Sequence, residues 1–293
     1  MLSEPSLALL LNTPAILVIL LLVAYPVLYS FYLSLHRWNL KRPNVFSFIW
    51  FGNYTQILST PEFWSALRVT VIFAFFAVSG ILVLGTGIAL ILNEEFRGRG
   101  LVRSLVLIPW AIPPVVNGLM WQWILNSKAG ILNGLLVAVG AIQEYRAWFL
   151  DSATAISMLV VAHIWNNLPF AVIILLAALQ TIPAELYDAA QVDRARMWQR
   201  FRHVTLPWLI HPILIIMILQ TMTAFRVFDL VYVLTGGGPG DSTTVIALLT
   251  FRTAFDYLDV GKGNAYAYII ALITLSLAAV YLKALYARGE FKI

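Results

Sequence analysis

Long uninterrupted runs of apolar residues constrain this chain more than any other feature of its sequence. Of its residues, 61% are hydrophobic and 11% charged, and the mean hydropathy is +0.85. Six runs are each long enough to cross a bilayer, for which roughly 20 residues suffice. They lie at about Ser6–Leu35, Trp64–Leu92, Ser104–Leu125, Thr154–Gln180, Leu206–Leu234 and Ala265–Leu285. The sequence therefore predicts an all-α membrane protein, a bundle of six transmembrane helices that forms one domain over residues 1–293.

Two apolar segments need separate treatment. The first run has no Lys or Arg before it and is too long for the apolar core of a signal peptide, so we expect a retained membrane helix. Between the third and fourth runs, Gly130–Ile142 is apolar but too short to span, which favours an interfacial or re-entrant helix. The third run contains Pro109, Pro113 and Pro114, and the carbonyls freed by these prolines must find partners on neighbouring helices or in a water-filled cavity.

The placement of Lys and Arg predicts the orientation. Six spans put both termini on the same side as the second and fourth loops, and this side carries the larger number of cations. They include Arg97, Arg200 and, near the C-terminus, Arg288 and Lys292. Because cytoplasmic loops are enriched in Lys and Arg, we expect a multi-pass protein of the cytoplasmic (inner) membrane with both termini in the cytoplasm.

Several classes of function are disfavoured by what the sequence lacks. Cysteine is absent, which excludes disulfides and thiolate chemistry. No phosphate-binding G-x-x-x-x-G-K-[ST] motif occurs, and the nearest fragment is Gly261-Lys262-Gly263. The four histidines are scattered. We predict no catalytic residue, no metal and no cofactor in this chain. The net charge of +5 in such a membrane protein indicates anionic lipid and no nucleic-acid partner.

One dense polar segment, residues 183–205, interrupts the apolar sequence. Pro183 suits the first turn of a helix, and Glu185 and Asp188 lie near its positive N-terminal end. Ala189 and Ala190 have almost no side-chain bulk, so another backbone can approach closely. This arrangement favours a docking surface for a cytoplasmic partner.

A second helix is expected directly after it. Trp198 and Phe201 would share one face with Ala195, directed toward the bundle, whereas Arg196 and Arg200 would lie on the opposite face. Such an amphipathic helix lies in the plane of the membrane. The simpler alternative is a basic interfacial helix that only binds anionic headgroups.

The polar segment resembles the "EAA" loop of the membrane subunits of binding-protein-dependent ABC importers. Asp188-Ala189-Ala190 takes the place of Glu-Ala-Ala, Arg194 the place of the glycine, and Val204-x-Leu206-Pro207 the hydrophobic-x-Leu-Pro ending. Aspartate shortens the reach of the acid. Arginine at the glycine position predicts that the backbone there does not take a conformation open only to glycine.

Three further stretches resemble the sugar-permease branch of this family, the maltose and glycerol-3-phosphate type. They are GNYTQIL with EFWSAL (residues 52–67), RGRGLVRSLVLIPWAIPPVV (97–116) and FDLVYVLTGGGPGDSTTV (228–245). The resemblance implies a permease subunit for a carbohydrate that works by alternating access. Its implied partners are a second, homologous permease, two cytoplasmic ATPase subunits that bind ATP and Mg²⁺, and an extracytoplasmic sugar-binding protein. Its implied ATPase-coupling residues are Glu185, Asp188, Ala189, Ala190, Arg194 and Arg196.

Polar residues inside the spans are candidates for the substrate path, because such groups are costly in a bilayer. They are Asn117, Trp121, Gln122, Asn166, Asn167, Gln220 and Thr221. Hydrogen bonds that join helices are the alternative role for each of them. Arg226 and Asp229 are three residues apart, and we expect them to share a helix face as a structural ion pair, with a clamp on the substrate as the alternative.

The outer loop Gly236-Gly237-Gly238-Pro239 is expected to be irregular, either a contact for the binding protein or a plain loop. Two rival functions stay open. One is a permease for another solute, such as a polyamine or a phosphate ester, and a polyamine path would need an unpaired intramembrane carboxylate, for which Asp229 is the candidate. The other is a membrane bundle whose basic loop only binds lipid.

Overall fold

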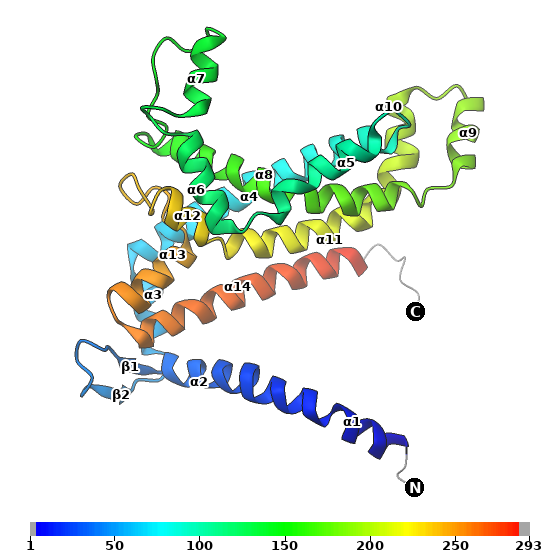
Figure 1. The fold of residues 1–293 in the computed structure, drawn as a ribbon. Helices are drawn as coiled ribbons and strands as arrows, with labels where there is room; N and C mark the ends of the chain where they lie inside the picture. Colours follow the sequence, from blue (N-terminus) through cyan, green and yellow to red (C-terminus); the bar gives the residue numbers. More distant parts are fainter. Residues whose placement is uncertain (1–3, 287–293) are drawn as a thin grey trace. The chain divides into compact units, whose positions relative to one another are not determined.

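The structure, a computed structural model, describes residues 4–286 and is predominantly helical (Figure 1). Its α-helices are α1 (Glu4–Ile19), α2 (Tyr25–Ser34), α3 (Gly52–Ser59), α4 (Pro61–Asn93), α5 (Arg99–Leu107), α6 (Pro114–Ile124), α7 (Ile131–Ala138), α8 (Ser152–Leu179), α9 (Ala184–Val192), α10 (Met197–Arg200), α11 (Leu206–Phe225), α12 (Asp229–Leu234), α13 (Ile246–Phe251) and α14 (Val260–Tyr286). Short π or 3₁₀ turns join some of them: η1 (Leu20–Ala24), η2 (Ile108–Ala111), η3 (Phe201–Thr205) and η4 (Arg252–Asp256).

The predicted membrane helices are present, but two of them differ from the expected spans. Among the described residues, five helices are long and apolar enough to span a membrane: Leu11–Ser34, Pro61–Asn93, Ser152–Leu179, Met197–Phe225 and Val260–Lys283. The third predicted span is not one helix. Its halves, Arg99–Ala111 and Pro114–Ile124, meet at a bend of 101°, and counting them as one broken span gives six. This confirms the all-α membrane class.

Prolines cause the bend, and α8 satisfies the backbone there. Pro113 and Pro114 supply no N–H, so the backbone ladder stops at Ile112: the Pro109 carbonyl keeps only the Ile112 N–H at 3.2 Å, and the Ile112 carbonyl has no backbone partner in the part of the chain that the structure describes. The Asn166 side chain on α8 donates its amide to the Pro109 carbonyl at 2.6 Å and to the Ile112 carbonyl at 3.1 Å. The expectation that a neighbouring helix meets the freed carbonyls is therefore confirmed, by a residue that the sequence had suggested for the substrate path.

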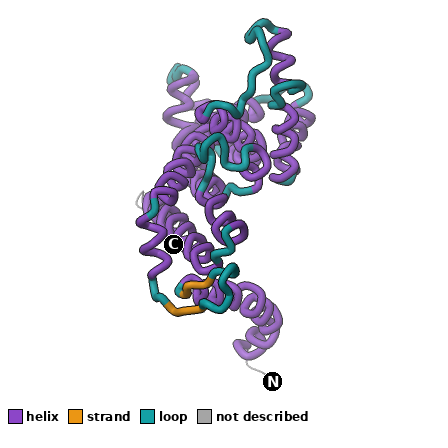
Figure 2. The backbone as a smooth tube through the Cα atoms, turned by 90° about the vertical axis from the view of Figure 1, so that its left-hand side faces the viewer, coloured by secondary structure: helices purple, strands orange, loops and turns teal. Residues whose placement is uncertain are grey.

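The chain folds into two compact units. One covers the described residues up to Trp64 together with Leu249–Leu272, and the other covers Ser65–Leu248 and continues from Ile273. In the first unit, β1 (His36–Trp38) pairs antiparallel with β2 (Phe46–Phe48), shown as strands in Figure 2. This hairpin was not foreseen. The Tyr54 hydroxyl of α3 pairs with the Ser34 hydroxyl at 2.7 Å, and burial raises the pKa of Tyr54 above its ordinary value.

The second unit has two apolar cores. One is formed by α4, α8, α12 and the end of α11, around Phe73, Leu159 and Val231. The other is formed by the far halves of α4 and α8 with the start of α11, around Leu175 and Leu209. Gly118 lets α6 approach α12 closely, because an added Cβ would lie 3.0 Å from the Val233 side chain.

The fifth predicted span is also corrected. It begins earlier, since η3 and α10 continue without a break into α11, and it ends at Phe225 instead of Leu234. Arg226 closes α11 with a non-helical ψ of 7°, and α12 starts anew at Asp229.

The apolar segment after α6 forms the short helix α7, as the sequence predicted for Gly130–Ile142. The fully buried side chain of Asn133 organises it. Its amide donates to the carbonyls of Asn126 (3.2 Å) and Arg146 (2.9 Å), and its oxygen accepts from the Arg146 N–H and the Trp148 indole, both at 3.1 Å. These four bonds hold the residues before α7 and the residues after it together.

Candidate functional site

A polar cavity of about 290 Å³ lies in the second unit, where α6, α8, the end of α11 and the start of α12 meet. Its lining residues are Pro114, Asn117, His163, Asn166, Asn167, Thr223, Arg226, Val227, Phe228, Asp229 and Leu230. Three predicted path residues, Asn117, Asn166 and Asn167, are thus brought together. The cavity forms where two of the long apolar elements are interrupted, at the prolines before α6 and at the gap between α11 and α12.

Two buried polar atoms beside this cavity have no hydrogen-bond partner within residues 4–286. They are the side-chain oxygen of Asn117 and Nε2 of His163. The Asn117 amide nitrogen donates to the Ala162 carbonyl at 3.3 Å, which fixes the direction of the side chain. Because a buried polar group without a partner is costly, such atoms indicate a site that a polar ligand or water fills.

Arg226 and Asp229 differ from the expectation. Both line the cavity, but no ion pair joins them in the described part of the chain, so the predicted helix-face pair is wrong. The physical reason is the break between α11 and α12, which removes the regular helical spacing. The Arg226 Nε donates to the Met222 carbonyl at 3.2 Å, and the guanidinium is exposed.

The other predicted path residues lie away from this cavity. Trp121 packs edge-on against Trp165, with ring centroids 6.0 Å apart. Gln122 lines a different cavity of about 260 Å³ next to Trp148. Gln220 and Thr221 are buried in α11, where the Thr221 hydroxyl lies 3.5 Å from the Tyr281 hydroxyl. His163 was not predicted as a path residue, because a single histidine in an apolar run forms no pattern. Its place four residues before Asn167 was the one signal in the sequence.

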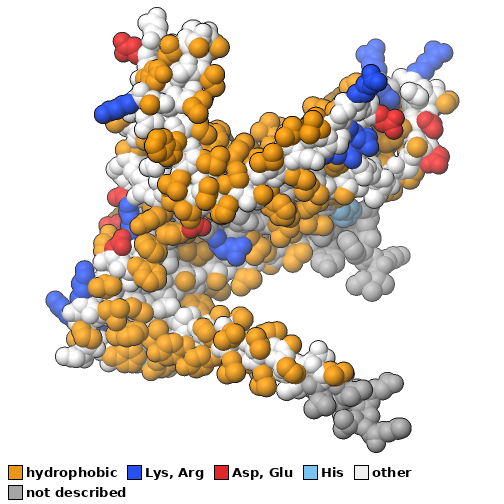
Figure 3. All heavy atoms as spheres, viewed as in Figure 1, with side chains coloured by type: hydrophobic (Ala, Val, Ile, Leu, Met, Phe, Trp, Pro, Cys, Tyr) orange, Lys and Arg blue, Asp and Glu red, His pale blue; other side chains and the backbone are white. Residues whose placement is uncertain are grey.

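The polar segment 183–205 folds as the elbow α9–α10, which Figure 1 shows at the end of the second unit away from α7. Lys, Arg, Asp and Glu side chains gather at this end in Figure 3. Glu185, Asp188 and Ala189 are exposed on α9, and Ala190 is half-buried.

The turn that ends α9 contains a left-handed residue. Arg194 has a φ of +53°, in the region that residues with a side chain also enter at some cost, so the expectation of a conformation not restricted to glycine stands. The Arg194 N–H donates to the Gln191 carbonyl (2.9 Å) and the Ala195 N–H to the Ala190 carbonyl (2.9 Å). This is the Schellman arrangement that closes a helix, and its two hydrogen bonds hold the arginine in a strained conformation.

The second helix also differs from the prediction. Arg196 does not lie on a helix face but precedes α10, where its N–H donates to the Gln199 side chain at 2.7 Å. Trp198 stacks on Phe201 but is 67% exposed, and Met197 is 80% exposed, so this aromatic side chain does not face the bundle. α10 begins at Met197, so Ala195 and Arg196 precede it and take no place on its faces.

Hydrogen bonding ties the elbow to the long helix that follows it. The hydroxyl of Tyr187 on α9 lies 3.0 Å from the hydroxyl of Thr205, the residue before α11. Tyr187 and Val204 both pack against the second apolar core, which includes Ile182. α9 is therefore joined directly to the start of α11. The sequence offered no signal for this link beyond the polarity of the two residues.

The predicted outer loop is ordered by hydrogen bonds from neighbouring threonines. The Thr243 hydroxyl donates to the Gly238 carbonyl at 2.7 Å and lies 2.8 Å from the Thr235 hydroxyl. Gly236 and Gly237 have φ values of +57° and +93°, conformations that side chains disfavour. The glycine run is therefore a built turn that precedes α13.

Comparisons with known proteins agree with this architecture. The trehalose/maltose transport system permease protein MalF of Thermococcus litoralis is 42% identical over 281 residues, which are 96% of this chain and 94% of that protein. The sulfoquinovosyl glycerol transport system permease protein SmoG of Agrobacterium fabrum is 36% identical over 282 residues, 96% of this chain and 91% of that protein.

A solved structure shows the same fold. The crystal structure of a bacterial alginate ABC transporter, in complex with an alginate pentasaccharide-bound periplasmic protein, contains a chain that matches with a TM-score of 0.84. That chain is 20% identical, and the match covers 98% of this chain and 96% of that one. The family profile of the binding-protein-dependent transport system inner membrane component matches residues 81–291. The chain therefore belongs to this family, the membrane-embedded permease subunits of ABC importers.

Proposed function

We propose that this permease carries a carbohydrate through the cavity between α6, α8, α11 and α12. Its relatives are named for trehalose and maltose and for sulfoquinovosyl glycerol, and the cavity offers groups that suit sugar hydroxyls. Amide groups, an imidazole, a guanidinium and a carboxylate provide both donors and acceptors. Neither of the two relatives reported above is named for a polyamine.

The observation that carries the proposal is the pair of unpartnered buried atoms, Asn117 Oδ1 and His163 Nε2, on the wall of the cavity. A hydroxyl group both donates and accepts, so a bound sugar would satisfy either atom whatever the tautomer of the imidazole. Phe228, which lines the cavity beside them, provides an aromatic face for the apolar side of a sugar ring.

The proposed partners are a second permease of the same family, two cytoplasmic ATPase subunits that hold ATP and Mg²⁺, and an extracytoplasmic sugar-binding protein. Closure of the ATPase pair would push on α9, and the Tyr187–Thr205 bond would pass the movement to α11, which forms one wall of the cavity. The acid of Asp188 would meet a cation of the ATPase, and exposed Ala189 would permit close contact. The alternating access of the cavity would follow from that movement.

We propose further that the elbow faces the cytoplasm and that both termini lie on its side of the membrane. Each membrane crossing changes sides, so the elbow, the loop that joins α4 to α5 and both chain ends share one face. Arg97 and Arg200 lie in these loops, in agreement with the positive-inside tendency. Arg288 and Lys292, which entered the sequence argument, lie outside the described residues.

The test is transport by the purified complex, reconstituted in vesicles, with a panel of sugars, a polyamine and a phosphate ester. Asp229→Asn should lower sugar transport about tenfold, because a hydrogen bond to a charged group contributes about 1.5–3 kcal/mol. Glu144→Gln, which removes an equal charge from an exposed position outside the cavity, should leave transport unchanged. Transport of the polyamine but of no sugar, abolished by Asp229→Asn, would assign the cavity to the rival solute.

A further inference from the structure

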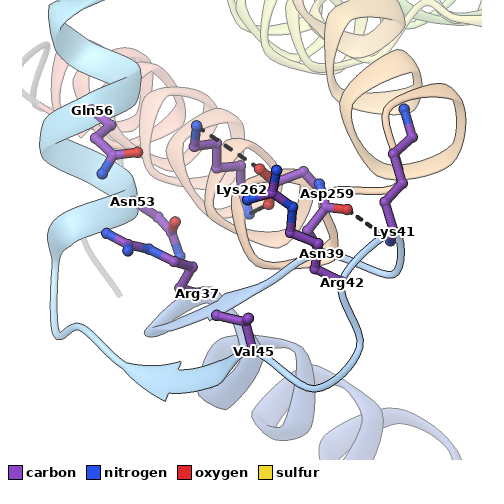
Figure 4. Close-up of a pocket in the computed structure, with 9 residues that line it drawn as sticks. All are labelled: Arg37, Asn39, Lys41, Arg42, Val45, Asn53, Gln56, Asp259 and Lys262. Carbon is purple, nitrogen blue, oxygen red and sulfur yellow. Dashed lines mark hydrogen bonds and ion pairs between the residues drawn. The ribbon is translucent and has the colours of Figure 1, made fainter.

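A second, strongly basic cavity lies in the first unit, separate from the proposed substrate path. Its volume is about 460 Å³, and it is enclosed by the β1–β2 hairpin, α3 and the start of α14. The lining residues are Arg37, Asn39, Lys41, Arg42, Val45, Asn53, Gln56, Asp259 and Lys262. Figure 4 shows Arg37, Asn53 and Gln56 on one side and Arg42, Asp259 and Lys262 on the other.

The charges around this cavity are unbalanced. Four cations face one carboxylate, and only Lys262 is paired with it, through contact between its Nζ and the Asp259 Oδ2 at 3.8 Å. Within residues 4–286, Arg37, Lys41 and Arg42 take part in no ion pair. The N-terminus of the 27-residue helix α14 adds positive potential at the same place. A concave site of this kind favours a small anion.

The backbone that carries these cations is held in place. The Leu40 N–H donates to the Leu258 carbonyl at 2.8 Å, and Asn39 bridges to Asp259, so the hairpin and the start of α14 form one framework. Gly261 makes the close approach possible, because a Cβ at this position would lie 2.2 Å from the His36 carbonyl oxygen. Asn53 is buried and donates to the carbonyls of Ser34 and His36, both at 2.8 Å. The cavity is therefore preformed.

The position along the chain places the cavity at the depth of lipid headgroups. Arg37 follows the first membrane helix, which ends at Ser34 after 24 residues, and Lys262 is the third residue of α14. A helix of that length rises about 36 Å, slightly more than the roughly 30 Å of hydrocarbon. Exposed aromatic side chains lie on β2 and directly after it: Phe46 (45%), Phe48 (47%), Trp50 (67%) and Phe51 (56%). Aromatic side chains of this kind gather at membrane surfaces.

We propose that this cavity binds the phosphate-bearing headgroup of an anionic phospholipid in the leaflet opposite the elbow. The cations would contact the phosphate oxygens, and the amides of Asn39 and Gln56 would bind the headgroup hydroxyls. A small headgroup fits the concave shape, whereas the acidic surface of a docking protein would meet mainly the exposed rim. The exposed aromatic side chains on and after β2 agree with a membrane surface more than with a water-exposed protein contact.

The test is lipid binding to the intact purified complex, titrated with phosphatidylglycerol or phosphatidylcholine and followed by native mass spectrometry. Arg42→Gln should weaken phosphatidylglycerol binding about fivefold, and Arg37→Gln with Arg42→Gln roughly 30-fold, since each cation near a charged membrane contributes a similar increment. Lys128→Gln removes an exposed cation outside this cavity and should change nothing. Arg37 and Arg42 have exposed side chains, so we expect the variants to keep the fold. Thermal unfolding of each variant checks this.

Three results would overturn the proposal. If the double variant binds phosphatidylglycerol as wild type does, the cavity does not hold the headgroup. If inorganic phosphate displaces the lipid at equal concentration, the site is one for free phosphate. If lipid binding is unchanged but the affinity of the complex for its solute-binding protein falls, the cations serve protein docking. None of these outcomes depends on which solute is transported, so the proposed carbohydrate function is tested separately.

Discussion

Arg194 holds a conformation in which an arginine is normally strained. Its φ of +53° brings Cβ close to a carbonyl oxygen, at a cost of about 1–2 kcal/mol for a residue with a side chain. The two hydrogen bonds of the α9 terminus keep it there. An arginine therefore occupies a left-handed turn that glycine would hold without this cost, and the cost is stored in the elbow.

Arg194→Gly should stabilise the protein. We expect a gain of about 0.5–1 kcal/mol in the free energy of unfolding, because relief of the strain exceeds the greater chain entropy of glycine. Arg196→Gly is the matched control: it removes the same charge two residues later, where φ is −69°, and should give no gain. Denaturant unfolding of the purified complex measures both. Equal or lower stability of Arg194→Gly would show that the turn carries no strain.

At the scale of elements, the elbow combines an exposed small-residue surface with a firm link to α11. Ala189 is exposed on α9, whereas Tyr187 on the same helix is bonded to Thr205 and packed on the second core. One face of α9 is thus free for a partner, and the other is attached to the membrane helix. This division is what a mechanical coupling element requires, and a helix that only rests on lipid does not need it.

Ala189→Trp should disrupt the complex. A bulky indole on the exposed face of α9 would prevent close approach of the ATPase, so we expect loss of ATPase co-purification and at least a tenfold fall in transport. Ala138→Trp places the same side chain at an exposed alanine of α7 and should have neither effect. Unchanged co-purification and transport in Ala189→Trp would instead favour the lipid-only elbow.

The elements differ in how far the sequence predicts them. Long apolar runs predict spans well, because a lipid-exposed backbone has to satisfy its hydrogen bonds within its own helix. The interruptions are harder. Prolines 109, 113 and 114 indicate irregularity but not a 101° bend, and the assumption of an unbroken helix through Arg226 produced a pair that does not exist. The hairpin was missed because strands of three residues carry no usable periodicity.

The candidate site was predicted only in part, because a local pattern reveals a polar residue but not where helices are interrupted. Asn117, Asn166 and Asn167 stand out as amides inside apolar runs, and the structure brings them to one cavity. His163 and the positions of Arg226 and Asp229 depend on how four separate helix segments meet, and no local pattern contains that information. Gln122 and Gln220 are equally polar residues in apolar runs, but the structure places both of them away from this cavity.

At the scale of the whole molecule, the topology makes opposite faces distinguishable by labelling. The sequence contains no cysteine, so single-cysteine variants have no background. With a membrane-impermeant maleimide on intact cells, Lys41→Cys should react and Asp188→Cys should react only after the membrane is opened. Both positions are exposed in the structure, so lack of reaction reports the barrier and not burial. Reaction of Asp188→Cys in intact cells would contradict a cytoplasmic elbow and the coupling proposal with it.

The proline joint before α6 has a mechanical consequence. In a continuous helix, swinging one half against the other breaks a row of ladder bonds, whereas here the two carbonyls at the joint are held by a single amide of Asn166. Pivoting α6 about Pro113 leaves both Asn166 bonds in place, because they hold the segment before the joint, and displaces instead the Asn117 side chain, whose amide donates to the Ala162 carbonyl of α8 at 3.3 Å. Because that side chain also borders the polar cavity, the stiffness of the joint and the occupancy of the cavity share one group.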